Sequence, residues 1–209
     1  MKKQITKKLF YLAIVIPLVL ISCQTLTPSS NPGDAPHEEP SASMPQQSGF
    51  ADKPALPNNS DIEGVQTFPD KSKYHNHVDT VTDPKGDAPP VSGEHFSAWQ
   101  NCGIYDQPVG LGNALHSMEH GAVWLTYRPS LDASQISDLQ AIAHGHEFVL
   151  MSPYPSQISD VILTAWNVQL VINSLPDDRI EKFIAYYENG PQNPEPGAPC
   201  SGAIGNPIQ

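Results

Sequence analysis

The sequence Ala122-Val123-Trp124-Leu125-Thr126-Tyr127 decides the predicted fold. Its β-branched and aromatic side chains, followed closely by Pro129, are typical of a buried strand. Residues 132–144 then carry apolar side chains at helical spacing, and Gly145 follows as a stop signal. The first predicted unit is therefore a strand that leads directly into an amphipathic helix.

The elements after this unit complete a small mixed domain. Residues 148–151 form a short apolar strand that ends before a proline. Residues 161–172 alternate well enough to predict one longer strand, with Trp166 at its middle. Residues 177–188 have an apolar stripe at helical spacing. The order strand, helix, strand, strand, helix predicts an α+β fold, with a small antiparallel sheet and two helices packed on one face.

An irregular segment precedes these elements. Residues 74–111 are rich in Pro, Gly and Asp, yet they hold four ring-bearing candidates for a site: His75, His77, His95 and Trp99. Such a long irregular segment in a compact domain is usually functional or disordered, and the ring-bearing residues favour order. We expect one domain over residues 72–190. A polar, Pro/Ser-rich disordered tether at residues 23–71 and an irregular Pro/Gly-rich tail at residues 191–209 flank it.

The N-terminus has the pattern of an export signal. Residues 1–22 begin with lysines and continue in an apolar run shorter than the about 20 residues of a membrane span. The run ends in Leu20-Ile21-Ser22-Cys23, which resembles the lipobox of bacterial lipoproteins. We expect residues 1–22 to be a signal peptide and Cys23 to carry the lipid that anchors the domain to a membrane of the cell envelope. Gln24 resembles outer-membrane sorting in a Gram-negative host. An uncleaved N-terminal anchor is the alternative.

The charge of the exported chain limits its partners. The whole chain holds 11 basic and 22 acidic residues, and residues 1–22 contain four of the basic ones and no acid. Cleavage would leave seven basic residues and a formal charge of −15. Such a surface repels nucleic acid, whose phosphates bind basic groups, and attracts cations. We therefore expect no nucleic-acid partner.

Two cysteines remain once Cys23 is lipidated. Because an exported protein lies in an oxidising compartment, we expect Cys102 and Cys200 to form a disulfide that ties the C-terminal tail to the domain. Two free thiols or two soft metal ligands are the alternatives.

The sequence His116-Ser117-Met118-Glu119-His120-Gly121 is the strongest candidate for a site. Residues four apart share one face of a helix and also one face of a strand, so the two imidazoles can converge in either structure. Convergent imidazoles are what a transition metal requires.

Three stretches resemble a bacterial family known as domain of unknown function 3105, over about His77 to Glu195. They are Pro89-Pro90-Val91-Ser92-Gly93-Glu94-His95-Phe96, then residues 115–123 around the two histidines, then Leu163-Thr164-Ala165-Trp166. Proline is usual in the family where Glu94 stands, and leucine is frequent where Met118 stands. The resemblance implies a family but no activity.

A metal site is the favoured hypothesis for the function. If residues 115–127 form one continuous strand, His116, Met118 and His120 project to one face at steps of about 7 Å. His95 and His77 are then the natural further ligands. We expect His95, His116 and His120 to bind copper, with His77 or Met118 completing the shell, and zinc as the alternative metal. The expected role is metal handling rather than catalysis.

Two other functions remain open. His116 to His120 match the H-x-x-E-H pattern of a zinc hydrolase, with Glu119 as general base and an acid such as Glu188 as third ligand. The flanking glycines and the short chain argue against it. Alternatively, the histidines are structural and the domain is a surface scaffold that binds a protein partner.

Other polar and aromatic residues have simpler explanations. His144 and His146 are expected to stabilise a helix C-terminus. The tryptophans Trp99, Trp124 and Trp166 are expected to line the core or the walls of the site.

Overall fold

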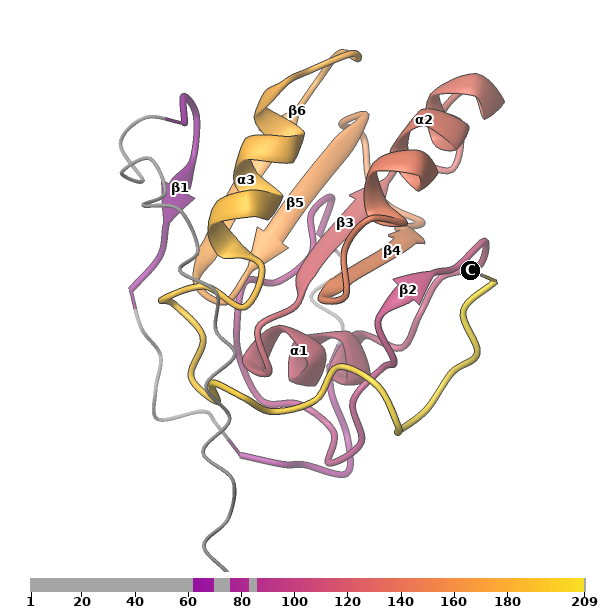
Figure 1. The fold of residues 1–209 in the computed structure, drawn as a ribbon. Helices are drawn as coiled ribbons and strands as arrows, with labels where there is room; N and C mark the ends of the chain where they lie inside the picture. Colours follow the sequence, from indigo (N-terminus) through magenta and orange to yellow (C-terminus); the bar gives the residue numbers. More distant parts are fainter. Residues whose placement is uncertain (1–61, 70–75, 83–85, 209) are drawn as a thin grey trace, which may run out of the picture. The chain divides into compact units, whose positions relative to one another are not determined.

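The computed structural model describes residues 62–69, 76–82 and 86–208, which include one mixed sheet and three helices (Figure 1). The strands are β1 (Gln66–Thr67), β2 (Gly103–Ile104), β3 (Val123–Tyr127), β4 (Val149–Pro153), β5 (Val161–Ala165) and β6 (Val168–Ile172). The helices are α1 (Leu111–Glu119), α2 (Ala133–Ala143) and α3 (Arg179–Tyr187). The α+β class and the predicted strand–helix order are therefore confirmed from β3 onward.

The sheet is mixed rather than antiparallel, which corrects the prediction. Its strands lie in the order β1-β6-β5-β3-β4-β2. β4 is parallel to both β3 and β2, whereas β3, β5, β6 and β1 pair antiparallel. The parallel pair arises because α2 connects β3 to β4, and parallel neighbours need such a crossover.

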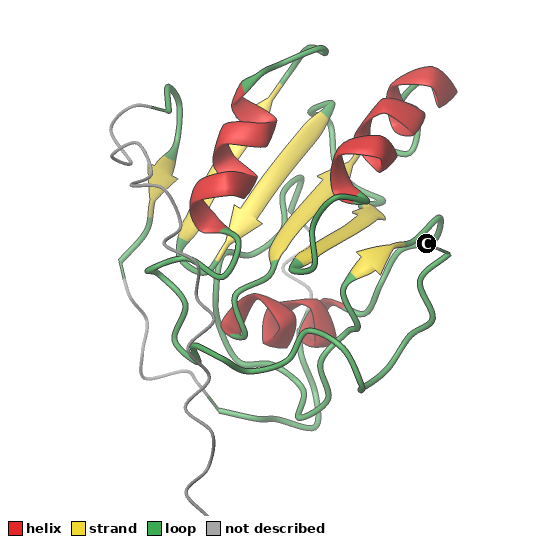
Figure 2. Ribbon diagram, viewed as in Figure 1, coloured by secondary structure: helices red, strands yellow, loops and turns green. Residues whose placement is uncertain are grey.

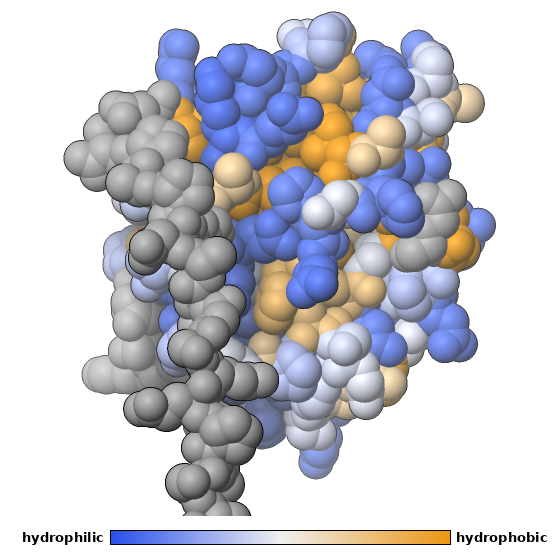
Figure 3. All heavy atoms as spheres, in the orientation of Figure 1, coloured by the Kyte–Doolittle hydropathy of each residue, from blue (hydrophilic) through white to orange (hydrophobic). Residues whose placement is uncertain are grey.

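Two helices, α2 and α3, lie over one face of the sheet, and α1 lies near the lower ends of its strands (Figure 2). The larger apolar cluster joins α2 and α3 to one face, through residues such as Leu139 and Phe183 against Leu125 and Met151. This confirms the two helices on one face. The smaller cluster joins α1 to the opposite face. Trp124 of β3 points to this face, because successive side chains of a strand point to opposite sides of the sheet. On the first face, apolar surface lies between α2 and α3 (Figure 3), in a cleft of about 640 Å³ that includes Leu139 and Ile142.

One predicted strand, and the strand assumed in the metal hypothesis, are wrong in detail. Residues 115–127 are not one strand, because α1 occupies Leu111–Glu119 and only Val123–Tyr127 is extended. Residues 161–172 form a hairpin rather than one strand: Ala165 pairs with Val168 across a two-residue turn. Asn167 in this turn has a φ of 60°, which asparagine tolerates better than most residues.

The folded part begins earlier than predicted. Ile62 is only 3% exposed and belongs to the larger apolar cluster, and β1 pairs with β6. The predicted tether, residues 23–71, therefore overlaps the folded domain. Cys23, His37, Met44 and His75 lie outside the described residues. Within the described ranges, no helix has the length and apolar character needed to cross a membrane.

Candidate metal centre

α1 presents a polar face and an apolar face. Ala114, Leu115 and Met118 pack into the smaller apolar cluster. His116, Glu119 and the C-cap residue His120 lie three and four positions apart and so share the other face. The predicted convergence of His116 and His120 is therefore produced by a helix, and the same geometry directs Met118 into the core.

Gly121 ends α1, and its lack of a side chain lets the C-terminal tail pack closely against it. The amide of Gly121 donates to the carbonyl of Met118 at 3.0 Å, and the amide of Ala122 donates to that of Ser117 at 2.9 Å. This is a Schellman motif, which favours glycine because its φ is positive, here 104°. A Cβ on Gly121 would lie 2.6 Å from Nδ2 of Asn193, so only glycine lets the tail lie this close.

The segment before β2 is bound to α1 by hydrogen bonds from the helix. Ser117 Oγ donates to the carbonyl of Gln100 at 2.6 Å, and Asn113 Nδ2 donates to that of Ala98, also at 2.6 Å. The amide of Val78 in turn donates to the carbonyl of His95 at 2.9 Å. These bonds bring the rings of His77 and His95 to α1 although both belong to irregular backbone.

The tail covers the end of α1 from the other side. The amide of Glu195 donates to the carbonyl of Glu119 at 3.2 Å. A disulfide joins Cys102 to Cys200 across a sequence separation of 98 residues, which confirms the predicted pairing. The tail thus brings the Glu195 carboxylate within 3.5 Å of Nε2 of His120.

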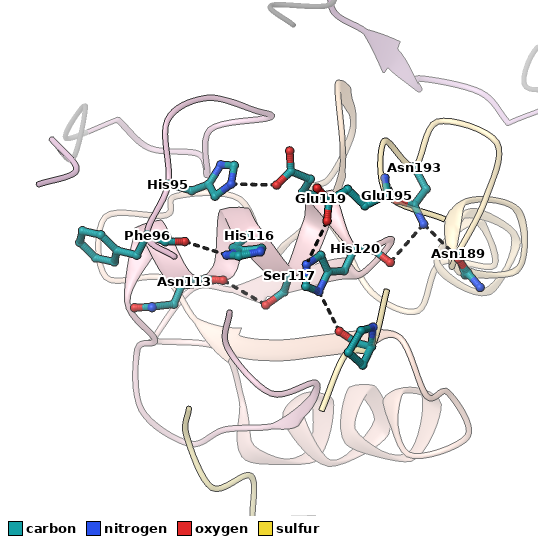
Figure 4. Close-up of polar contacts among 11 residues, drawn as sticks. His95, Phe96, Asn113, His116, Ser117, Glu119, His120, Asn189, Asn193 and Glu195 are labelled. Carbon is teal, nitrogen blue, oxygen red and sulfur yellow. Dashed lines mark hydrogen bonds and ion pairs between the residues drawn. The ribbon is translucent and has the colours of Figure 1, made fainter. Parts of the chain in front are cut away.

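Three histidines are oriented in the same way, and Figure 4 shows the carbonyl contacts of His116 and His120. Nδ1 of each lies near a backbone carbonyl oxygen: His95 with Gly93 at 2.9 Å, His116 with Phe96 at 2.7 Å, and His120 with Pro199 at 2.8 Å. A carbonyl oxygen can only accept, so Nδ1 carries the hydrogen in all three rings. In the neutral form, Nε2 then holds the lone pair that can bind a metal.

These rings and two carboxylates form two overlapping groups. The inner group is His77, His95, His116 and Glu119, and the outer group is His116, His120 and Glu195. Within each group the candidate ligand atoms lie within 4.8 Å of one another. His116 belongs to both, with its ring centroid 4.9 Å from those of His77 and His95 and 4.5 Å from that of His120.

His95 and Glu119 form a buried acid–base pair within the inner group. Their side chains are 0% and 3% exposed, and Nε2 of His95 lies 2.8 Å from the Glu119 carboxylate. This nitrogen falls outside the strict geometry of a hydrogen bond, and the contact is an ion pair when His95 is protonated. Burial acts to lower the pKa of His95, but Glu119 and the Gly93 carbonyl outweigh it and raise the pKa above 6.5.

His116 is held neutral by contrast. Burial lowers its pKa to about 4, and the neighbouring imidazoles of His120, His95 and His77 act in the same direction, against the hydrogen bond to Phe96. A neutral imidazole is the form that binds a metal. His116 is therefore ready to act as a ligand at neutral pH.

Tryptophans form part of the walls. Trp99 lies 4.8 Å from His120 and 5.7 Å from His116 between ring centroids, and Trp166 lies 6.1 Å from His95. Trp124 instead lies in the smaller core cluster and donates its indole N–H to Ser152 at 3.0 Å.

The predicted ligands are only partly brought together. Within the described residues, no group contains both His95 and His120; each lies beside His116 in a different group. Met118 is 0% exposed and packs in the smaller core cluster, on the face of α1 away from His116 and His120.

The carboxylates differ from those expected. Glu188 is not at the site, because its carboxylate accepts from His146 at 2.6 Å and from the amide of Phe148 at 2.9 Å. From the sequence, Glu119 was expected to be a general base or a group that orients His116, and not a metal ligand; Glu195 was missed. The predicted disulfide was the one signal that could have placed Glu195 near the site, since Cys200 lies close behind it in the sequence.

The fold and site together define an α+β domain with a buried histidine–glutamate cluster between one helix, an irregular segment and a disulfide-tethered tail. The chain belongs to the family described as protein of unknown function DUF3105, whose model matches residues 77–202. This match confirms the resemblance found in the sequence and spans both groups of the cluster. No curated protein and no solved structure matches the chain.

Proposed function

We propose that this protein binds a transition metal at the histidine–glutamate cluster, with copper favoured over zinc, and that it handles the metal rather than catalysing a reaction. The inner group offers three imidazoles and one carboxylate. Nitrogen and oxygen donors of this kind suit divalent copper and zinc, and such a site generally binds Cu²⁺ more tightly than Zn²⁺. The buried position of Met118 removes the thioether as an argument for copper.

One observation carries the proposal: backbone carbonyls orient the Nε2 atoms of neighbouring histidines beside a buried carboxylate. Metal-binding histidines commonly donate their second ring nitrogen to a carbonyl or carboxylate, which fixes the tautomer and the ring orientation. Here Phe96 and Gly93 supply those carbonyls for His116 and His95. The cluster therefore has an outer shell of hydrogen bonds as well as candidate ligands.

Glu119 adds an electrostatic argument. A buried carboxylate is costly unless a positive group lies beside it. The lysine and arginine side chains in the described part of the chain pair elsewhere, with Asp160, Asp177 and Asp178. His95 can supply the positive charge by binding a proton, and a metal ion that replaces this proton would supply more.

The place of action belongs to the same proposal. We infer a lipoprotein of the cell envelope, anchored to the membrane through Cys23, with its domain outside the cytoplasm. The Cys102–Cys200 disulfide supports export, because disulfides persist in oxidising compartments.

The test is the metal content of the full chain, purified in detergent without a histidine tag, exposed to copper or zinc and desalted. We expect near-stoichiometric metal by mass spectrometry, and its loss in His116→Ala. His144→Ala is the matched control, since this exposed histidine belongs to neither group. A folded wild-type protein that retains no metal would refute the proposal.

That negative result would favour a scaffold that binds a protein partner. One observation favours this scaffold role: Nδ1 of His95 contacts the Gly93 carbonyl, and its Nε2 contacts the Glu119 carboxylate. A protonated His95 could stabilise the fold without any metal.

A further inference from the structure

The two groups of the cluster share one side chain. His116 belongs to the inner group with His77, His95 and Glu119, and to the outer group with His120 and Glu195. Its Nδ1 donates to the carbonyl of Phe96 at 2.7 Å, so only Nε2 has a lone pair for a metal. One lone pair forms one metal bond. The two groups therefore cannot both hold an ion with His116 as a ligand.

The groups differ in their exposure to solvent. The Glu195 side chain is 54% exposed, whereas that of Glu119 is 3% exposed. A hydrated cation loses less of its hydration shell at an exposed carboxylate than at a buried one, so it reaches Glu195 at lower cost. His77 is also exposed, but an imidazole carries no negative charge and attracts a cation less strongly than a carboxylate does.

The outer group is also the weaker ligand set. It offers two imidazoles and an exposed carboxylate, against three imidazoles and a buried carboxylate in the inner group. Charge interactions strengthen as water is excluded, so the ion gains more beside Glu119 than beside Glu195. The gradient of affinity therefore runs inward from Glu195 to Glu119.

We propose that the cluster is a relay with two positions for one divalent transition-metal ion. The ion is captured from solvent by Glu195 and His120, keeps its bond to His116, and exchanges its other ligands for His95 and Glu119. The same steps in reverse release the ion to an acceptor. This inference rests on the proposed metal-binding function and adds the path of the ion and the role of the tail.

The first test is stoichiometry, measured by native mass spectrometry of the full chain with Cu²⁺ alone as the probe. The relay requires one ion per chain in the wild type and none in His116→Ala. His120→Ala should retain an ion at the inner position, and His95→Ala should retain one more weakly, because each position then offers only two imidazoles and one carboxylate. Two ions per wild-type chain would refute the relay while leaving metal binding intact. No ion in a folded wild type would refute metal binding itself.

The second test is the rate of uptake, followed by stopped-flow quenching of tryptophan fluorescence by Cu²⁺. Glu195→Gln should slow uptake about tenfold, the lower end of the range for electrostatic guidance of a charged ligand. It should leave the equilibrium affinity nearly unchanged, because the ion ends in the inner group. Glu119→Gln should instead weaken the equilibrium affinity with little effect on initial capture.

Glu94→Gln is the matched control for the rate. This exposed acid is next to His95 in the sequence and belongs to neither group, so it removes the same charge near the cluster. The relay predicts a clear difference between Glu195→Gln and Glu94→Gln. Equal slowing in both would mean that only the general negative field attracts the ion, and the capture role of Glu195 would be refuted.

Discussion

At the scale of single residues, His95 and Glu119 form a place for which a proton and the proposed metal ion would compete. Nε2 of His95 and the Glu119 carboxylate lie 2.8 Å apart with almost no exposure to water. Two lone pairs facing each other at that distance repel, so something positive must lie between or upon them. A proton on His95 meets this need in the metal-free protein, and a bound ion meets it once the proton leaves. Metal binding should therefore release a proton.

The pKa of His95 tests this view of the pair. In the metal-free protein we expect NMR titration to give His95 a pKa above 6.5, because Glu119 and the Gly93 carbonyl outweigh the effect of burial. Glu119→Gln removes the charge but keeps the shape, so the pKa should fall. Glu94→Gln should leave the pKa of His95 unchanged. An unchanged His95 pKa in Glu119→Gln would show that the carboxylate does not control this histidine.

At the scale of elements, α1 is the base on which the site is built, and close packing at Gly112 allows this. A Cβ on Gly112 would lie 2.7 Å from Cδ2 of Phe96 and 2.8 Å from Cγ2 of Val81. The carbonyl of Phe96 accepts the hydrogen bond that orients His116. The contact between helix and segment therefore sets the orientation of a candidate ligand.

Substitution of Gly112 should separate these surfaces. Alanine gains up to about 1 kcal/mol of helix propensity over glycine, whereas overpacking typically costs about 1–3 kcal/mol. We expect Gly112→Ala to lower the free energy of unfolding by about 1 kcal/mol in urea denaturation, and to weaken metal binding. Gly145→Ala is the control, since the nearest atom to its Cβ would be the Ile142 carbonyl oxygen at 3.7 Å. A stabilised Gly112→Ala with unchanged metal affinity would contradict this account.

The elements that sequence could predict are those with long, regular patterns. The helix at residues 132–144 and the strand at 122–127 have clear periodicity, and α2 and β3 match them closely. α1 was missed because it has only nine residues and most of its polar face is buried as well, so its short pattern does not stand out as a surface helix. The hairpin at Trp166-Asn167 was missed because its turn contains neither glycine nor proline.

The candidate site was predictable only where its residues are close in sequence. Residues four apart lie on the same face of a helix and of a strand, so the convergence of His116 and His120 could be predicted from the sequence. The presence of two ligand groups, rather than one, depends on where His95 and the tail lie. These contacts join irregular segments far apart in the chain, and no periodic pattern specifies them.

At the scale of the whole molecule, the buried histidines couple stability to pH. His116 has a folded pKa of about 4 against its ordinary 6.5, so below pH 6.5 the unfolded chain takes up a proton that the folded protein does not. Its contribution to stability is complete above pH 6.5 and is lost as the pH falls toward 4. His95 has the opposite sign: its raised pKa contributes stability that is complete below pH 6.5 and is lost as the pH rises above it.

We therefore expect the metal-free protein to lose roughly 3 kcal/mol of unfolding free energy between pH 6.5 and pH 4 through His116, from the shift that burial produces. Urea denaturation in the presence of a chelator measures this change. His116→Gln should flatten the dependence on pH over that interval, whereas His144→Gln should keep the wild-type slope. Equal slopes in the wild type and His116→Gln would show that His116 is not the group responsible.

The Cys102–Cys200 disulfide connects the stability of the whole molecule to the site. It fixes the tail at the residue after Pro199, whose carbonyl accepts from His120, and close behind Glu195. The double variant Cys102→Ser, Cys200→Ser should lose about 2–5 kcal/mol of unfolding free energy, as is typical for a native disulfide. Its remaining folded molecules should still bind Cu²⁺ in the inner group, because His95, His116 and Glu119 do not belong to the tail.

Uptake of Cu²⁺ by the double variant should be slow, as in Glu195→Gln, because the tail no longer holds the outer group in place. Wild type that has been reduced, alkylated at the two freed thiols and desalted before Cu²⁺ is added should show the same slow uptake, and the same treatment should leave the double variant unaffected. This comparison separates loss of the bond from side effects of serine. Stopped-flow fluorescence and urea denaturation on the same samples measure the two effects. If the folded double variant lost equilibrium binding altogether, the inner group would depend on the tail, and the separation of the two positions would be wrong.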